Sequence, residues 1–132
     1  MNSVTIKYSQ IVMPQDANIL GTLFGGQMVS WMDIAAAKAV HRFLKESKAD
    51  AALTRAIDAI EFKEPVHVGN WVNFEARITS TGNSSISIKV DAYKETKLVQ
   101  NILACTARFT FVSVKKMDDG TYQKVDHCMV IG

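Results

Sequence analysis

Only one segment of this 132-residue chain has a helical pattern, and that helix is apolar around most of its circumference. The pattern predicts a helix from about Gly25 or Gly26 to about Leu44–Lys48. Counted at ~100° per residue, its narrow polar stripe consists of Gln27, Ser30, Lys38, His41, Arg42 and Lys45. Its other faces carry Met28, Val29, Trp31, Met32, Ala35, Ala36, Ala39, Val40 and Phe43. An ordinary amphipathic helix has a narrower apolar stripe, so this one must be covered on several sides.

Most of the remaining chain alternates apolar and polar residues, which predicts strands with one buried face. The predicted strands are residues 3–13, 53–62, 71–79, 85–93, 98–114 and 122–130, with turns at 81–83, 94–97 and 118–120. The helix can bury itself only against the sheet that these strands form. The sequence therefore predicts an α+β fold in a single domain, residues 1–132, in which a curved antiparallel sheet surrounds one helix.

The composition excludes several classes of protein. Fifteen basic and 13 acidic residues give a net charge of +2, and neither sign is concentrated in one half, which argues against a nucleic-acid partner or a membrane-binding patch. No stretch approaches the ~20 apolar residues that cross a bilayer, and the first residues lack an export pattern. Cys105 and Cys128 are therefore expected to be reduced thiols, and the protein is expected to be cytoplasmic.

Asp33 is the residue of greatest chemical interest, because it lies at the edge of the apolar face or within it. An ionised carboxylate there costs several kcal/mol unless it is paired. It either pairs or reaches solvent as a structural residue, or it serves as a general base, and the residues favour neither alternative. Gly25 and Gly26 would open the N-terminus of the same helix, where free N–H groups stabilise a developing oxyanion. A tight entry turn is the simpler use of such a pair.

Several segments resemble the hotdog-fold acyl-CoA thioesterases, namely the YciA-type bacterial enzymes and the brain-type cytosolic acyl-CoA hydrolases. They are MPQDAN (13–18), GTLFGG (21–26), WMDIAAA (31–37), AIDAIEFKEPVHVGNWV (56–72), TGNSSISIKV (81–90) and ARFTFVSV (107–114). The resemblance covers residues 11–122 and implies a hotdog fold that hydrolyses acyl-CoA to a free acid and coenzyme A. It also implies a homodimer with a continuous sheet, assembled as a trimer of dimers into a homohexamer.

The resemblance assigns roles to four residues of the site. Asp33 would be the general base or the nucleophile, and Asn18 of the other subunit would position water or substrate. Backbone N–H groups at Gly25 or Gly26 would form the oxyanion hole. Without the resemblance, Asn18 is a loop asparagine that turns the chain.

Coenzyme A is part of the substrate and of the product, so no separate cofactor is expected. The turn Asn83, Ser84 and Ser85 resembles the family's nucleotide-side loop, although a plain hairpin turn explains these residue types equally well. His41 lies eight residues beyond Asp33, ~12 Å along the helix, so the two cannot pair. The histidines and cysteines lack a metal-binding spacing.

Two other functions remain open at this stage. A hotdog dehydratase or hydratase needs a histidine paired with an acid, and the chain does not place one near Asp33. A non-catalytic protein that binds or senses acyl-CoA is the second alternative. It offers no reason for the chain to carry both Asn18 and Asp33.

Overall fold

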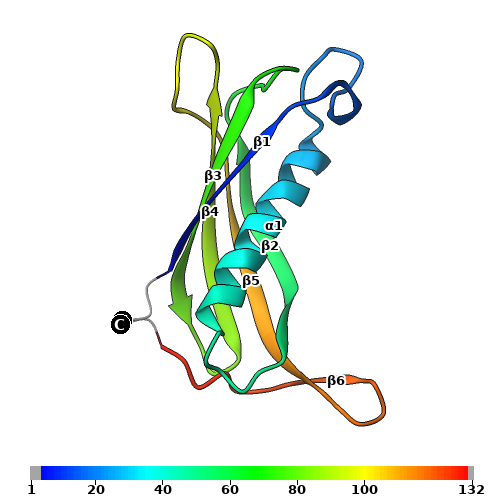
Figure 1. Ribbon diagram of the computed structural model, residues 1–132, viewed down its shortest axis with the longest axis vertical. Helices are drawn as coiled ribbons and strands as arrows, with labels where there is room; N and C mark the ends of the chain where they lie inside the picture. The colour runs from blue at the N-terminus through cyan, green and yellow to red at the C-terminus, as the bar shows by residue number, and fades with distance from the viewer. Residues whose placement is uncertain (1–3, 131–132) are drawn as a thin grey trace.

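The computed structural model describes residues 4–130 (Figure 1). Strand β1 (Thr5–Ile11) leads through a short 3-10 helix, η1 (Pro14–Asp16), to the helix α1 (Gly25–Phe43). The later strands are β2 (Ala51–Phe62), β3 (Trp71–Thr81), β4 (Ser85–Glu95), β5 (Ile102–Lys116) and β6 (Tyr122–Lys124). All strand pairs are antiparallel, in the order β1-β3-β4-β5-β2, and β6 pairs with β5.

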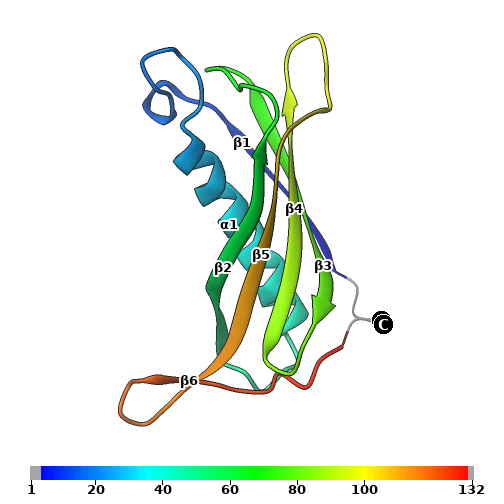
Figure 2. The same ribbon diagram turned by 180° about the vertical axis from the view of Figure 1, so that it is seen from behind.

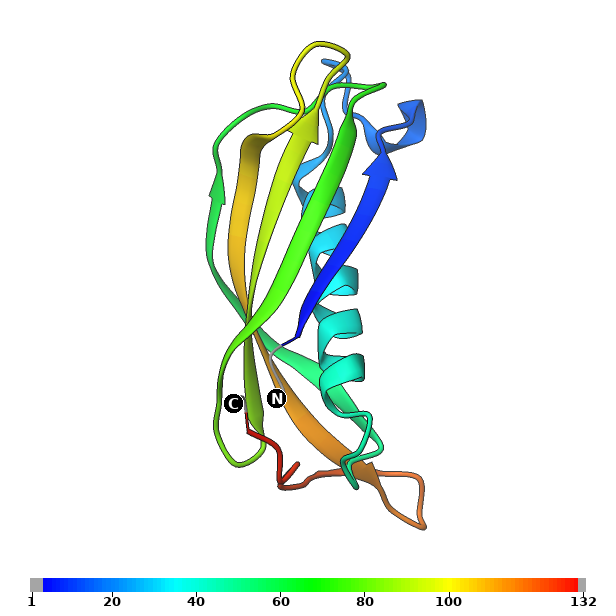
Figure 3. The same ribbon diagram turned by 60° about the vertical axis from the view of Figure 1, so that its left-hand side comes forward.

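The sheet curves around α1, which lies along its inner face (Figure 3). Seen from behind, the strands lie in front of the helix (Figure 2). The core forms where the apolar faces meet, and Met32, Ala35 and Ala36 of α1 are fully buried there with Ile88 and Phe109 of the sheet. The predicted hotdog fold of the α+β class is confirmed. Within residues 4–130, none of the helices is long and apolar enough to cross a membrane.

The strand predicted at residues 98–114 begins later, because residues 96–99 form a turn. The hydroxyl of Thr96 accepts hydrogen bonds from the N–H groups of Leu98 and Val99, at 3.3 and 3.0 Å. Such side-chain bonds compete with a sheet ladder. Leu98 is accordingly almost fully exposed, and β5 begins at Ile102.

The strand predicted at residues 122–130 was also too long, since β6 ends at Lys124. Beyond it the chain crosses to the β3–β4 turn, where His127 N–H donates to the carbonyl of Asn83 at 3.0 Å. Cys128 has a positive φ of 59°, which an extended strand does not allow. Other boundaries moved by fewer residues, and Ser3, the first residue of the predicted strand 3–13, lies outside the described residues.

Strand β2 is an edge of the sheet, and it runs antiparallel to α1 beside it. An added Cβ at Gly25 would lie 3.3 Å from the Phe62 ring, so the start of the helix meets the end of the strand. β2 has two irregularities in its pairing with β5, at Arg55 and between Asp58 and Glu61. Most of its residues are exposed, including its large apolar side chains, which are Leu53, Ile57, Ile60 and Phe62.

Candidate active site

Asp33 lies in the middle of α1, on the side that faces β2. It is half-buried, and its Oδ1 accepts a hydrogen bond from Thr54 Oγ1 at 2.9 Å. This bond fixes one carboxylate oxygen and leaves Oδ2 available to another group. Asp33 has no basic partner within residues 4–130, so of the two structural alternatives only partial contact with solvent fits, alongside a role as a general base.

Thr54 was missed by the sequence analysis. It sits directly opposite Phe111 of β5, whose ring is buried on the helix side of the sheet. That register points Thr54 toward α1, but the sequence alone does not show which strand lies beside Asp33. Strict alternation places Thr54 on the same face as Asp58, and only the irregularity at Arg55 turns Thr54 to the helix side.

Asn18 lies in the loop before α1, where its side chain organises a turn. Its Nδ2 donates to Thr22 Oγ1 at 2.8 Å, and its Oδ1 accepts the N–H groups of Leu20 and Thr22 at 2.9 and 3.2 Å. The bond to Leu20 is the local pattern of an Asx turn. Asn18 forms no hydrogen bond with Asp33 of its own chain.

Asp16 connects this loop to the start of the helix, and the sequence analysis did not single it out. Its carboxylate is buried and accepts Met13 N–H and Gln27 Nε2, both at 2.9 Å. Its carbonyl accepts the N–H of Phe24 at 3.0 Å. The loop that carries Asn18 is thereby held against the first turn of α1.

Gly25 and Gly26 are the first two residues of α1, as predicted, and neither has a positive φ. A tight entry turn therefore does not explain them. A Cβ at Gly25 would press on Phe62, whereas one at Gly26 would meet nothing within 4 Å. The N-cap, Phe24, provides no side-chain hydrogen bond, so the first N–H groups of the helix are available to a ligand.

The oxyanion donors and Asp33 are too far apart to serve one carbonyl group within one chain. Gly25 and Asp33 are eight residues apart, about 12 Å along the helix axis. An oxyanion donor must lie about 3 Å from the oxygen, and a base must reach a water beside the carbon. Gly25 and Asp33 of one chain therefore cannot act together on one carbonyl group.

Two cavities of about 380 Å³ each lie along the α1–β2 groove, one on either side of the Asp33–Thr54 pair. The N-terminal cavity lies beside Gly25, Met28 and Phe62. The C-terminal cavity is lined by Ala37 and Val40 of α1, by Lys45 just beyond the helix and by Phe111 of β5, among others. Both volumes fall within the roughly 300–1,000 Å³ of small-molecule sites.

The predicted coenzyme A turn, Asn83–Ser85, lies at the end of the sheet beside the C-terminal segment. Its backbone is used structurally, because the carbonyl of Ser84 accepts Ser113 N–H at 2.8 Å. The carbonyl of Ser85 lies 3.1 Å from His127 Nε2. His127 is buried and packs on Phe43, so it is a structural residue. Over residues 4–130, the titratable side chains form no cluster able to hold a metal.

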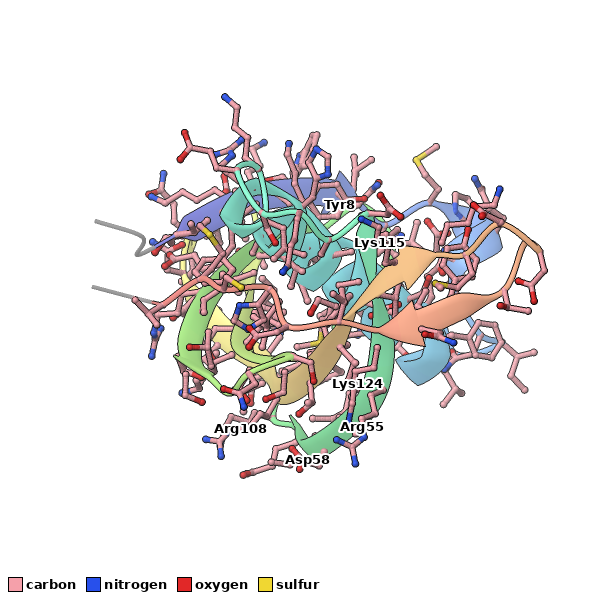
Figure 4. The ribbon with its side chains drawn as sticks, turned by 90° about the horizontal axis from the view of Figure 1, so that it is seen from below. Tyr8, Arg55, Asp58, Arg108, Lys115 and Lys124 are labelled. Carbon is pink, nitrogen blue, oxygen red and sulfur yellow. The ribbon has the colours of Figure 1, made fainter. Side chains whose placement is uncertain are left out.

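The charged residues of β2 point away from the groove. Figure 4 shows Arg55, Asp58 and Arg108 projecting from the side of the sheet opposite α1. Asp58 pairs with Arg108 in the β2–β5 register, and Phe109, the next residue, is fully buried on the inner face. Asp33 is the carboxylate near the middle of the groove, whereas the charged residues that line its two cavities lie toward the ends, namely Lys63 and Glu64 at one end and Lys45 and Asp50 at the other.

The fold and the groove define a hotdog protein with a helix-borne carboxylate. Residues 20–100 match the thioesterase superfamily, and the chain belongs to this family. The acyl-CoA thioester hydrolase YciA of Salmonella typhimurium is 32% identical over 108 residues, 79% of this chain and 78% of that protein. The prediction of a hotdog-fold thioester hydrolase is confirmed at the level of the family.

Two solved structures are also similar. The hexameric thioesterase of Yersinia pestis superposes with a TM-score of 0.76 and is 32% identical, covering 89% of this chain and 92% of that one. The acyl-CoA hydrolase of Staphylococcus aureus, in complex with butyryl coenzyme A, coenzyme A and coenzyme A disulfide, has a TM-score of 0.77 and 25% identity. The match covers 93% of this chain and 72% of that one.

Proposed function

We propose that this protein hydrolyses acyl-CoA thioesters to free acids and coenzyme A, with Asp33 as the reacting carboxylate. The Asp33–Thr54 pair carries the proposal, because a threonine hydroxyl fixes one carboxylate oxygen beside two cavities. The YciA relative and the S. aureus complex support acyl-CoA as the substrate. The hexameric Y. pestis enzyme supports an oligomeric protein.

In the proposed reaction, water attacks the thioester carbonyl carbon while Asp33 takes its proton. The N–H groups of Gly25 and Gly26 from a second copy stabilise the oxyanion of the tetrahedral intermediate. Asn18 of that copy orients the water or the carbonyl group. The C–S bond then breaks, and Asp33 returns the proton to the coenzyme A thiolate.

Direct attack by Asp33 is the alternative within the same site, and it forms an acyl-enzyme anhydride that water then opens. A single turnover in H₂¹⁸O distinguishes the two routes. The general-base route places the label in the product acid, whereas the first turnover by the anhydride route leaves label in the Asp33 carboxylate when water attacks there. Mass spectrometry of the peptide that contains Asp33 reads the outcome.

The dimer that builds this site is expected to form through β2. The strand presents a free edge with exposed apolar side chains, which a second copy can extend as a continuous sheet. Gly25 lies beside Phe62, and Asp33 lies beside Thr54. For Gly25 of one copy to lie near Asp33 of the other, Phe62 of one β2 must lie opposite Thr54 of the other, so the two-fold axis passes midway between them, near residue 58. Three such dimers would form the hexamer.

Co-expression of Asp33→Asn with Asn18→Ala tests both the chemistry and the shared site. Each variant alone is expected to lack activity, because every site has lost one member. A mixed dimer keeps one site with both residues intact, so random pairing should restore about a quarter of wild-type activity. Thiol release from butyryl-CoA, checked by detection of the free acid, measures the result.

The outcomes separate the alternatives. If verified mixed dimers regain no activity, then either Asp33 and Asn18 of one site come from the same chain, or one of the two residues takes no part in catalysis. Full activity of Asp33→Asn alone would reject Asp33 as the reacting group. An acyl-CoA that binds wild type but is not hydrolysed would identify a binding or sensing protein instead.

The turn Asn83–Ser85 remains the proposed contact for the nucleotide end of coenzyme A. The support is the resemblance of this turn to the family's nucleotide-side loop, together with the hydroxyl groups that it carries. Ser84→Ala is expected to raise KM for acyl-CoA while kcat stays close to wild type, because the contact lies far from the reacting carbon. An unchanged KM would limit the turn to its structural role.

A further inference from the structure

The C-terminal cavity continues the face of α1 that carries Asp33. Ala37 is one turn beyond Asp33, about 6 Å along the axis, and Lys45 lies two residues beyond Phe43, the last residue of the helix. Ala37 and Lys45 both line the cavity. On the facing strand β2, Ala52 also lines the cavity. It precedes Thr54 by two residues, so both side chains point to the same side of the strand. The lining residues that come nearest to the Asp33–Thr54 bond along the chain are therefore Ala37 and Ala52, while Asp33 and Thr54 do not line the cavity themselves.

The cavity changes from apolar to charged along its length. Near Asp33 its walls are Ala37, Val40 and Ala52, with the Phe111 ring as the floor. Farther along, it is lined by polar and charged residues, which are His41, Lys45, Ser47 and Asp50. The order follows from the sequence, because α1 and β2 are antiparallel and both lead toward the turn that connects them.

Hydrogen bonds fix the residues at the end of the cavity that is farther from Asp33. Ser47 Oγ donates to the carbonyl of His127 at 2.8 Å and accepts Ala49 N–H at 3.1 Å. Asp50 donates its N–H to the carbonyl of Val114 and accepts Lys116 N–H on its carboxylate, at 2.9 and 2.7 Å. The cavity is also more enclosed than the N-terminal one. A preformed pocket suits the end of an acyl chain. Because His127 also joins this end of the cavity to the Asn83–Ser85 turn, the nucleotide of the same substrate would have to contact that turn in a second copy.

We propose that this cavity receives the acyl chain of the thioester, and that its charged end restricts the enzyme to short and medium acyl groups. The inference rests on the proposed function, since it places the thioester carbon at Asp33. Methylene groups gain burial against Ala37, Val40 and Phe111. A longer alkyl chain would displace water from Lys45 and Asp50 without replacing its hydrogen bonds, which is unfavourable.

Two substitutions are expected to move the preference for acyl-chain length in opposite directions. Lys45→Met replaces the charge with an apolar side chain of similar length, and Ala37→Leu fills the entrance. The readout is the ratio of kcat/KM for dodecanoyl-CoA to that for butyryl-CoA. Lys45→Met is expected to raise this ratio about fourfold or more, the effect of one additional buried methylene. Ala37→Leu is expected to lower it about tenfold or more.

A matched control carries the same chemical change as Lys45→Met outside the cavity. Lys38→Met lies on α1; Lys38 does not line the cavity and is exposed. Its ratio is expected to match wild type. Thermal unfolding and sedimentation verify that each variant is folded and assembled as wild type is.

Binding of S-butyl- and S-dodecyl-CoA thioethers, measured by calorimetry, supplies a readout that does not need turnover. The ratio of the two Kd values should move with Lys45→Met and Ala37→Leu as the kinetic ratio does. If Lys45→Met matches Lys38→Met in both ratios, the cavity does not hold the acyl chain. If the Kd ratios shift but wild type hydrolyses nothing, the proposed function fails while the binding site stands.

Discussion

Thr54 is the residue through which the fold controls Asp33. Its hydroxyl donates to Asp33 Oδ1 at 2.9 Å, and hydrogen bonds to charged groups contribute about 1.5–3 kcal/mol. Thr54→Val keeps the side-chain shape and removes the donor. We expect kcat to fall about tenfold or more with a smaller change in KM, because Asp33 is no longer oriented. Steady-state kinetics with butyryl-CoA measure the changes in kcat and KM separately.

Thr54→Ser is the matched control, because it restores the hydroxyl on a smaller side chain. It is expected to recover most of the kcat that Thr54→Val loses. If kcat rises with pH in wild type but not in Asp33→Asn, we expect Thr54→Ser to show the same rise as wild type. Equal losses in both Thr54 variants would show that the methyl group, and not the hydroxyl, is what matters.

The two cysteines differ in environment and should differ in reactivity. Burial raises the pKa of the Cys105 thiol to about 11, so at pH 8 it is protonated and poorly nucleophilic. Cys128 is exposed. A chromogenic disulfide reagent should therefore modify one thiol per native chain and two after unfolding.

Cys128→Ser identifies the reactive thiol, since the native variant should react with none. This variant also removes the protein's own signal from assays of coenzyme A release. Rapid modification of two thiols in the native wild type would mean that the environment of Cys105 opens. As pH approaches 11, Cys105 begins to ionise, and its reaction rate should rise.

At the scale of elements, β2 is the strand through which two copies are expected to meet. A two-fold axis near Asp58 brings the two copies of that residue opposite each other, at the ~4.5–5.5 Å Cα separation of antiparallel pairs. This separation suits a disulfide. In a Cys128→Ser background, Asp58→Cys is expected to form a covalent dimer under mild oxidation, which non-reducing electrophoresis detects.

Ala51→Cys, at the other end of the same strand, is the control and should remain monomeric on the gel. The irregularity between Asp58 and Glu61, with its positive φ of 51° at Ala59, can shift the register by one residue. Neighbouring cysteine variants therefore complete the scan. Crosslinking that is strongest at Ala51 would place the axis elsewhere and separate Gly25 from the second Asp33.

The helix and strands were predictable from the periodicity of apolar residues. The errors in strand boundaries arose where local hydrogen bonds turn the chain before the apolar pattern ends. The alternation of β3 and β4 and the wide apolar surface of α1 were sufficient to predict one helix on a curved sheet. Leu98 and Val99 looked like strand residues, but the Thr96 hydroxyl turns the chain there. Similarly, residues 125–130 are held by the β3–β4 turn rather than by a strand partner.

At the scale of the whole molecule, activity is expected to depend on assembly. Ile57 is partly exposed on the β2 edge, and Ile57→Lys would place a charge in the predicted interface. We expect dissociated protein with little residual activity but a similar fold, because the side chain already meets solvent in the single chain. Sedimentation velocity, circular dichroism and turnover of butyryl-CoA measure the three properties.

Leu98→Lys is the matched control, because Leu98 is 91% exposed in the β4–β5 loop, away from β2. It should retain both assembly and activity. A dissociated Ile57→Lys protein that remains fully active would contradict the two-chain site. An assembled, active Ile57→Lys protein would instead move the interface away from this part of β2.

The candidate site was only partly predictable from the sequence. Asp33 and the glycines stand out because a carboxylate and a Gly-Gly pair interrupt an apolar helix. Thr54 depends on which strand lies beside that helix, and Asp16 on a loop contact to Gln27. The separation of about 12 Å between Gly25 and Asp33 follows from helix geometry, and it agrees with the two-chain site that the family resemblance implies and that we propose.

The free edge of β2 also matters before the protein is assembled. An unpaired strand with exposed Leu53, Ile57 and Phe62 is a template for wrong partners as well as for a second copy. The chain limits this hazard locally, since Arg55, Asp58 and Glu61 are charged and the strand is interrupted twice. Newly made chains that fail to find a copy are therefore the population most prone to aggregate, and the yield of folded protein should depend on how quickly chains meet.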